Sequence, residues 1–74
     1  MFGELLKKKR KAKGLTQGEL AELSNITVQT ISHIEKGKIP SPLIAYRLSK
    51  AFGDEELFKY FENIKNKNET LNAH

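Results

Sequence analysis

Four side chains near the middle of the chain carry groups suited to reading the edges of DNA bases: Val28, Gln29, Ser32 and His33. The carboxamide of Gln29 can pair bidentately with N6 and N7 of adenine, and Val28 can pack on a thymine methyl group. The Ser32 hydroxyl and the His33 imidazole can each donate or accept a hydrogen bond, so neither predicts a particular base. Two of these residues have alternative roles that involve no base contact. Val28 could be a partly buried residue at a helix start, and His33 could touch only water or phosphate.

Catalytic chemistry has little support in the sequence. The chain has no Cys, which excludes a thiol nucleophile and a thiolate metal site. His33 and His74 are its only histidines, and neither has a neighbour at the spacing of metal ligands. Glu19 and Glu22 lie one helical turn apart, but an exposed charged face explains them better than a general acid–base pair. With no glycine-rich phosphate loop either, we expect a protein that is not an enzyme and that needs no metal or cofactor.

Basic residues are concentrated near the N-terminus. The 74-residue chain has a net charge of +4 and a pI of about 9.5, and six of its 13 basic residues lie between Lys7 and Lys13. Between Asp54 and Glu69 the balance of charge is reversed. This distribution indicates a polyanion bound on one side of the molecule; the alternative is a solvated basic helix without a partner.

Side chains that read bases need a helix that a neighbouring helix holds in place. Residues 17–36 predict two such short helices, joined by a tight turn. Thr16 followed by Glu19 forms a capping-box signature at the start of the first. Asn25 falls at the bend, where it tolerates a positive φ, and Thr27 is a suitable N-cap for the second helix. The apolar residues expected to point inward from the second helix are Ile31 and Ile34.

Three further helices are predicted around this pair, so the fold is expected to be all-α. One spans residues 3–13, one follows a cap at Ser41, and one follows a cap at Asp54. The apolar residues of their inner faces are Phe2, Leu5, Leu6, Ala12, Leu43, Ile44, Leu48, Phe52, Leu57, Phe58, Phe61 and Ile64. Residues 65–74 are polar and aperiodic, which is typical of a disordered tail. We therefore expect one domain over residues 1–64.

Two sequence runs carry a resemblance to a known family. They are R-x-x-x-G-L-T-Q-x-E-L-A from Arg10 to Ala21, and T-x-Q-T-I-S-x-I-E-K-G-K from Thr27 to Lys38. Through them the chain resembles the DNA-binding domain of the phage Cro and repressor (XRE) family. The resemblance implies a compact five-helix bundle of the lambda-repressor-like type, with the helix-turn-helix formed by the second and third helices. The chain departs from the family at Asn25, where Gly is usual, but Asn can adopt the same backbone conformation.

The resemblance also implies roles for individual residues outside the base-reading set. Arg10 and Glu35 match a partly buried structural ion pair of the family, although Arg10 could instead touch a phosphate. Gln17 matches a residue that holds a backbone phosphate; the alternative is an exposed side chain without a partner. Thr27 and Lys38, at the start and just beyond the end of the recognition helix, are the other expected phosphate contacts.

These features predict a sequence-specific regulator of transcription that binds a double-stranded DNA operator, most often as a repressor in this family. The protein is expected in the cytoplasm, encoded by a bacterium or phage and associated with the nucleoid, with no membrane partner and no evident small-molecule ligand. A homodimer would read half-sites about 34 Å apart. Phe58 and Tyr60 are its possible contacts, unless they close the monomer's own core. The alternative function is an antitoxin-like or anti-repressor module that binds another protein.

Overall fold

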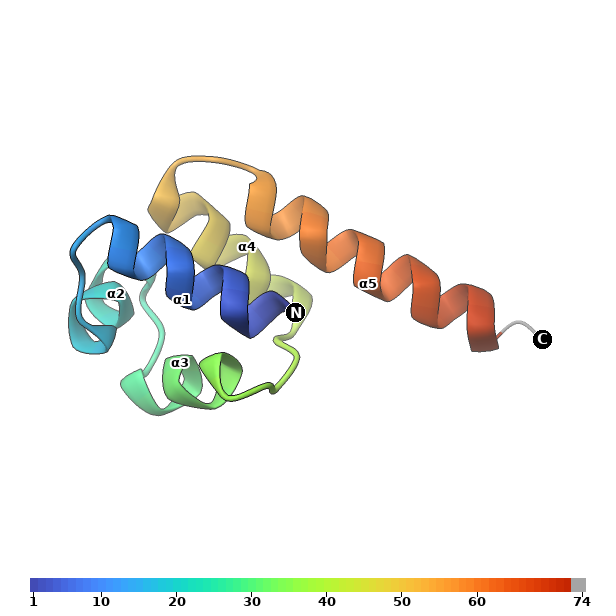
Figure 1. The fold of residues 1–74 in the computed structure, drawn as a ribbon, viewed down its shortest axis with the longest axis horizontal. Coiled ribbons are helices and arrows are strands. Elements are labelled where there is room, and N and C mark those ends of the chain that lie inside the picture. The colour runs from blue at the N-terminus through green and yellow to red at the C-terminus, as the bar shows by residue number, and fades with distance from the viewer. Residues whose placement is uncertain (73–74) are drawn as a thin grey trace.

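The structure is a computed structural model that describes the backbone of residues 1–72 and the side chains of residues 1–64. Its described part contains only α-helices: α1 (Phe2–Ala12), α2 (Gln17–Ser24), α3 (Val28–Glu35), α4 (Pro42–Phe52) and α5 (Glu56–Asn72). Figure 1 shows α1 across the middle of the molecule, with α3 along one edge and α5 extending away from the other helices. The all-α, five-helix architecture predicted from the sequence is confirmed.

The turn between α2 and α3 has the geometry predicted for it. Asn25 has a φ of 56° and is the non-glycine residue with a positive φ in the described backbone. Its N–H donates to the Glu22 carbonyl at 3.3 Å, and the Ile26 N–H donates to the Ala21 carbonyl at 3.0 Å. These two bonds form a Schellman motif, which satisfies carbonyl groups at the end of α2. The chain then turns sharply enough for α3 to cross α2.

The starts of three helices are fixed by the predicted caps. The Thr16 hydroxyl accepts from the Glu19 N–H at 3.1 Å while the Glu19 carboxylate accepts from the Thr16 N–H at 2.8 Å, a complete capping box. The Thr27 hydroxyl accepts from the Thr30 N–H at 3.2 Å at the start of α3. At α4 the Ser41 hydroxyl caps the first turn, ahead of a proline at the first helical position.

One hydrophobic core receives side chains from all five helices. Its fully buried members are Phe2, Leu6, Leu20, Ile31, Ile34, Leu48 and Leu57. Side chains of this size each contribute about 1.5–3 kcal/mol when they are removed from water. Because Ile31 and Ile34 lie on the inner face of α3, the opposite face of that helix is left to solvent.

Two residues predicted for the inner faces of their helices lie outside the core. Leu43 is 56% exposed and Ala12 is also exposed. The buried face of α4 passes through Ala45 and Leu48, and at 3.6 residues per turn Leu43 lies about 200° around the helix from Ala45. Ala12 is displaced by the same angle from Arg10, the last buried residue of α1. Both predictions were wrong because an apolar residue type was taken as inward-facing without regard to its angular position.

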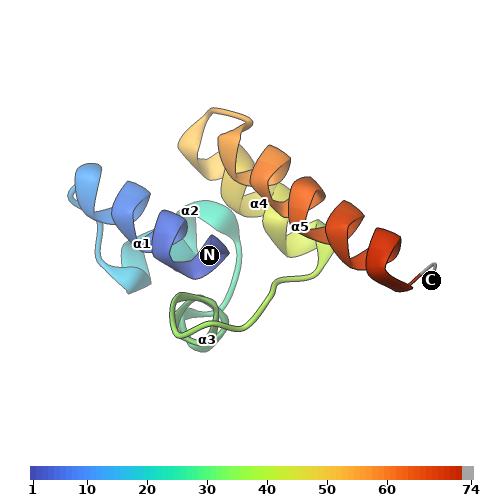
Figure 2. The same cartoon turned by 45° about the vertical axis from the view of Figure 1, so that its right-hand side comes forward.

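The last helix is longer than the sequence analysis expects. α5 continues past residue 64 to Asn72, and both Figure 1 and Figure 2 show its C-terminal half extending beyond the rest of the molecule. The proposed tail thus overlaps the end of α5 as the structure has it, while residues 73–74 lie outside the described residues. The division into a domain at 1–64 and a disordered tail stays a prediction about the chain in solution.

Candidate nucleic-acid interface

The four predicted base-reading residues lie together on the outward face of α3. Val28 is 42% exposed, Gln29 and His33 are exposed, and Ser32 is half-buried. They occupy positions i, i+1, i+4 and i+5, so they form one continuous stripe along the first turns of the helix. In Figure 2, where α3 is seen nearly end-on, this helix stands at one edge of the molecule, away from α4 and α5. A helix exposed in this way has the dimensions that the DNA major groove admits.

Thr27 stands at the start of this stripe, and its side chain is engaged locally. Besides capping the Thr30 N–H, its hydroxyl lies 2.8 Å from the Thr30 hydroxyl. Both groups remain close to solvent at the N-terminal end of α3, because Thr27 is exposed and Thr30 is half-buried. The phosphate contact predicted for Thr27 stays a prediction, and the structure adds Thr30 as a neighbouring hydroxyl that the sequence analysis did not single out.

Arg10 and Glu35 are brought together as a bidentate, nearly buried ion pair between α1 and α3. Arg10 Nε lies 2.7 Å from Glu35 Oε2, and Arg10 Nη2 lies 3.1 Å from Glu35 Oε1. Their side chains are only 10% and 5% exposed. Arg10 Nη1 also donates to the Leu15 carbonyl at 2.8 Å, just ahead of α2. One guanidinium thus connects α1, α3 and the segment that leads into α2.

The electrostatics of this pair favour its charged form. Burial by itself raises the pKa of the Glu35 carboxyl, but hydrogen bonds from Arg10 and Gln17, and the charges of Arg10 and Lys7, lower it by more. The hydrogen bond with Glu35 raises the pKa of Arg10 in spite of its burial. The pair therefore remains ionised at neutral pH, and Lys7 adds a positive charge beside it.

Gln17 makes a contact that sequence reasoning missed. Its Nε2 donates to Glu35 Oε1 at 3.1 Å, so the first residue of α2 is tied to the ion pair. The side chain is half-buried, which differs from the alternative of an exposed glutamine without a partner. The sequence separation of the two residues gives no local signal for this contact, since it depends on how α2 packs against α3.

The end of α3 is held closely against the start of α1. A Cβ added at Gly3 would lie 2.1 Å from the Ile34 carbonyl oxygen, so only glycine fits this approach. Beyond α3, the Lys38 N–H donates to the His33 carbonyl at 3.0 Å. This bond fixes the backbone of Lys38 directly after the recognition helix, and its side chain is exposed. The predicted helix over residues 3–13 begins at this glycine, and a glycine inside a predicted helix was the available signal of a close approach.

The basic run of α1 is divided between internal and solvent-facing roles. Lys9 is only 18% exposed, and its Nζ lies 3.2 Å from Asp54 Oδ2 and 2.5 Å from Glu56 Oε1. The hydrogen bond with Glu56, supported by Asp54, raises the pKa of Lys9. Since Arg10 is also occupied, the positive groups of the run that face solvent are Lys7, Lys8, Lys11 and Lys13.

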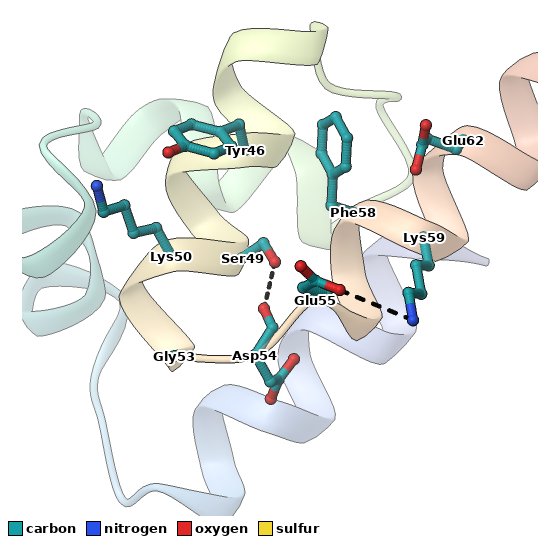
Figure 3. A pocket seen from close by; sticks show the side chains of 9 residues that line it. All are labelled: Tyr46, Ser49, Lys50, Gly53, Asp54, Glu55, Phe58, Lys59 and Glu62. Carbon is teal, nitrogen blue, oxygen red and sulfur yellow. Dashed lines mark hydrogen bonds and ion pairs between the residues drawn. The ribbon is translucent and has the colours of Figure 1, made fainter.

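The two residues predicted as possible dimer contacts lie in different environments. Tyr60 packs against Phe2 of α1, with ring centroids 6.5 Å apart. Phe58 instead packs edge-on against Tyr46 of α4 at 6.2 Å, with an interplanar angle of 86°. Figure 3 shows these two rings above an open pocket whose other walls carry Lys50 and Lys59 among the charged side chains. Both residues therefore pack against the monomer's core, since the ring centroid of Phe58 also lies 6.1 Å from that of Phe61. Phe58 and Tyr46 in addition line a partly open surface between α4 and α5.

The described part of the chain contains neither a helix suited to span a membrane nor a cluster of metal ligands. Through residue 72, no helix combines the length and the apolar character needed to cross a membrane. Among the described side chains, no group of three or more His, Asp or Glu residues is placed to hold a metal ion. His33 belongs to the outward stripe of α3, and His74 lies outside the described residues.

Comparison with known proteins agrees with this geometry. A family model described as helix-turn-helix matches residues 6–58, which include α2, α3 and α4 entirely. A relative from Methanothermobacter thermautotrophicus (strain Delta H), named as an uncharacterized HTH-type transcriptional regulator, is 45% identical over 58 residues. That match covers 77% of this chain and 84% of the relative. No solved structure matches the chain significantly. The chain belongs to the helix-turn-helix family of Cro/repressor-type transcriptional regulators, which is a family of DNA-binding proteins and not of enzymes.

Proposed function

We propose that this protein is a sequence-specific repressor that inserts α3 into the major groove of a double-stranded DNA operator. The observation that carries the proposal is the outward stripe of α3, which presents Gln29 and His33 to solvent while Ile31 and Ile34 fix the helix from behind. A recognition helix needs this combination of a rigid inner face and a polar outer face. Gln29 is the leading candidate for a specific contact, because a glutamine can pair bidentately with adenine.

Phosphate contacts would set the position of α3 in the groove. Gln17 and Thr27 stand at the N-termini of α2 and α3, and Lys38 follows the C-terminal end of α3. Contacts from both ends of a recognition helix fix its register without carrying sequence information themselves. The solvent-facing lysines of α1 add a sequence-independent attraction to DNA that weakens as salt is raised.

The proposed repressor acts as a homodimer, at least on DNA. One domain of this size reads few base pairs, and two copies would read half-sites about 34 Å apart. The surface lined by Phe58 and Tyr46 supports this contact, because Tyr46 is 49% exposed there while Tyr60 packs against Phe2. Sedimentation should show a dimer on a palindromic site; a monomer both free and on that site would contradict the dimer.

Selection from a random pool of double-stranded DNA tests the proposal as a whole. We expect an enriched inverted repeat whose affinity exceeds that for a scrambled sequence at the same salt concentration. Gln29→Ala should reduce the affinity for the enriched site by about 5- to 150-fold, the range of one good base contact. Asn63→Ala changes an exposed, neutral residue of α5; it is the matched control and should bind like the wild type.

The other possible results of the DNA selection each favour a different conclusion. If the enriched site survives Gln29→Ala, base reading moves to Val28, Ser32 or His33. Equal affinity for the enriched and scrambled sequences, with a steep dependence on salt, would mean phosphate contacts alone. Absence of DNA binding at moderate salt would contradict the proposed function and favour the antitoxin-like alternative, with a protein as the main ligand.

A further inference from the structure

We infer that Glu35 is a positioning residue for DNA binding, which orients the carboxamide of Gln17 toward a phosphate before DNA arrives. This inference rests on the proposed function and extends it, because it gives the ion pair between α1 and α3 a role in recognition besides its role in folding. The group that touches DNA is Gln17. Glu35 acts through it and is not expected to touch DNA.

The geometry begins with how the two oxygens of Glu35 are shared. Oε2 accepts from Arg10 Nε at 2.7 Å, while Oε1 accepts from both Arg10 Nη2 and Gln17 Nε2, each at 3.1 Å. Arg10 in turn holds the Leu15 carbonyl at 2.8 Å. The acceptor for Gln17 is therefore fixed by a bidentate guanidinium, which is itself attached to the segment before α2. The network thus holds the Gln17 side chain directly and, through the Leu15 carbonyl, the backbone two residues before it.

The chemistry of the acceptor determines which way the carboxamide turns. An ionised carboxylate only accepts hydrogen bonds, so the NH2 group of Gln17 must face Glu35 and the carbonyl oxygen cannot. One of the two hydrogens on Nε2 is used by Glu35, and the other remains as a donor. A phosphate oxygen accepts from such a donor. The rotamer freedom of a glutamine is then restricted in the free protein, which reduces the entropy lost on binding.

A carboxylate close to the DNA backbone would ordinarily repel the phosphates, but the neighbours of Glu35 neutralise its charge. Its side chain is only 5% exposed and is paired with Arg10, and Lys7 lies near enough to contribute a further positive charge. The local net charge is therefore not negative. Removing Arg10 alone would strand the carboxylate, so single substitutions in the pair cannot separate folding from positioning.

A double substitution makes that separation possible. In Arg10→Met/Glu35→Met the buried pair is replaced by apolar side chains of similar length, an exchange that often leaves stability unchanged or increased. The variant keeps a packed interior but offers no acceptor to Gln17. We expect it to bind the selected operator about 3- to 10-fold more weakly than the wild type, as does Gln17→Ala. Adding Gln17→Ala to the double variant should cause no further loss.

The slope of affinity against salt distinguishes this loss from the loss of a charged contact. Gln17 is neutral and Arg10 with Glu35 is a neutral pair, so none of these changes should alter the slope, whereas replacing a phosphate-binding lysine reduces it. Wild-type affinity in the double variant, together with weakened binding by Gln17→Ala, would overturn the role of Glu35. Wild-type affinity in Gln17→Ala would overturn the inference altogether. If the unmodified protein selects no DNA, it is the proposed function that fails.

A second measurement on the unmodified chain keeps the inference open to contradiction if the double variant does not fold. Gln17 and Gln29 are its only glutamines, and Gln29 is exposed on α3, so it serves as an internal control. Nuclear magnetic relaxation of the two side-chain NH2 groups in the DNA-free protein should give a clearly higher order parameter for Gln17 than for Gln29, whose value should fall in the flexible range below about 0.6. Equal, low order parameters would show that Gln17 is not held in advance, and would overturn the inference.

Discussion

Arg10 and Lys9 are neighbours in one basic run, yet they hold two different regions of the molecule in different ways. Arg10 reaches α3 through a nearly buried, bidentate pair with Glu35. Lys9 reaches the start of α5 through Asp54 and Glu56, whose side chains are 46% and 63% exposed. Besides the shared core, the recognition helix is thus joined to α1 by a desolvated network, whereas the charged link from α1 to the start of α5 lies at the surface.

The two kinds of ion pair fix the positions of their helices to different degrees. A buried, fully hydrogen-bonded pair stabilises little in net terms but allows few alternative arrangements, whereas an exposed pair is screened and readily broken. The proposed base reading would require the first kind of support, because the stripe on α3 would have to meet base edges at hydrogen-bond distances. In the proposed dimer, the α4–α5 surface with Tyr46 and Phe58 would need to adjust only to a second protein surface.

Arg10→Ala is expected to have the largest effect on stability. This change leaves Glu35 as an unpaired, buried carboxylate, and we expect a loss of about 3–5 kcal/mol in the free energy of unfolding. Urea denaturation followed by circular dichroism measures the loss. The same change at the neighbouring exposed residue, Lys11→Ala, is the control and should cost less than about 0.5 kcal/mol. A loss below about 1 kcal/mol for Arg10→Ala would mean that the buried pair does not fasten α3.

A second support of the recognition helix is tested by Gly3→Ala. The new methyl group would meet the Ile34 carbonyl oxygen at 2.1 Å, so α1 and the end of α3 must move apart. We expect a loss of about 1–3 kcal/mol from this overpacking. Gly18→Ala in the first turn of α2 is the matched control, because the nearest atom to its new Cβ is 3.9 Å away; it should be neutral or stabilising by up to about 1 kcal/mol. Equal effects at the two glycines would contradict the close contact.

The sequence predicted the regular parts of this region well, for identifiable reasons. Caps such as Thr16 and the bend at Asn25 are local, since each depends on residues within a few positions, and both were found as expected. The stripe on α3 was found because Ile31 and Ile34 mark its opposite face. Helix caps and helical periodicity can be predicted from a single sequence, because both depend on residues close together in the chain.

Some contacts between helices could not be predicted from the sequence. The link from Gln17 to Glu35 and the anchoring of Lys9 at Asp54 and Glu56 depend on packing angles that no single helix encodes. Composition was misleading here, because Lys9 looks like any other lysine of its run. Leu43 shows the related limit that residue type alone does not give the angular position on a helix.

Acidification should reveal the contribution of the buried Arg10–Glu35 pair to the free energy of unfolding. The pKa of Glu35 is lowered in the folded protein from an ordinary value of 4.5, so its ionised form stabilises the fold at neutral pH. That contribution is present above the unfolded-state pKa and is lost as pH falls through the lowered folded-state pKa. Unfolding free energies measured from pH 7 down to about pH 2 should therefore decline more steeply below about pH 4.5 in the wild type than in Arg10→Met/Glu35→Met. Parallel profiles would show that Glu35 does not contribute to the decline.

The smallest expected effect concerns Lys9. Lys9→Met keeps the aliphatic part of the side chain but removes the charge that joins α1 to the start of α5, and surface pairs of this kind are worth about 0.2–1 kcal/mol. Lys8→Met, at an exposed neighbour, controls for the general effect of lowering the positive charge. The difference between the two variants should disappear in about 1 M salt, where the Debye length falls to about 3 Å. If Lys9→Met instead costs as much as Arg10→Ala and does so at all salt concentrations, α5 is fastened as firmly as α3, and the contrast between the two regions fails.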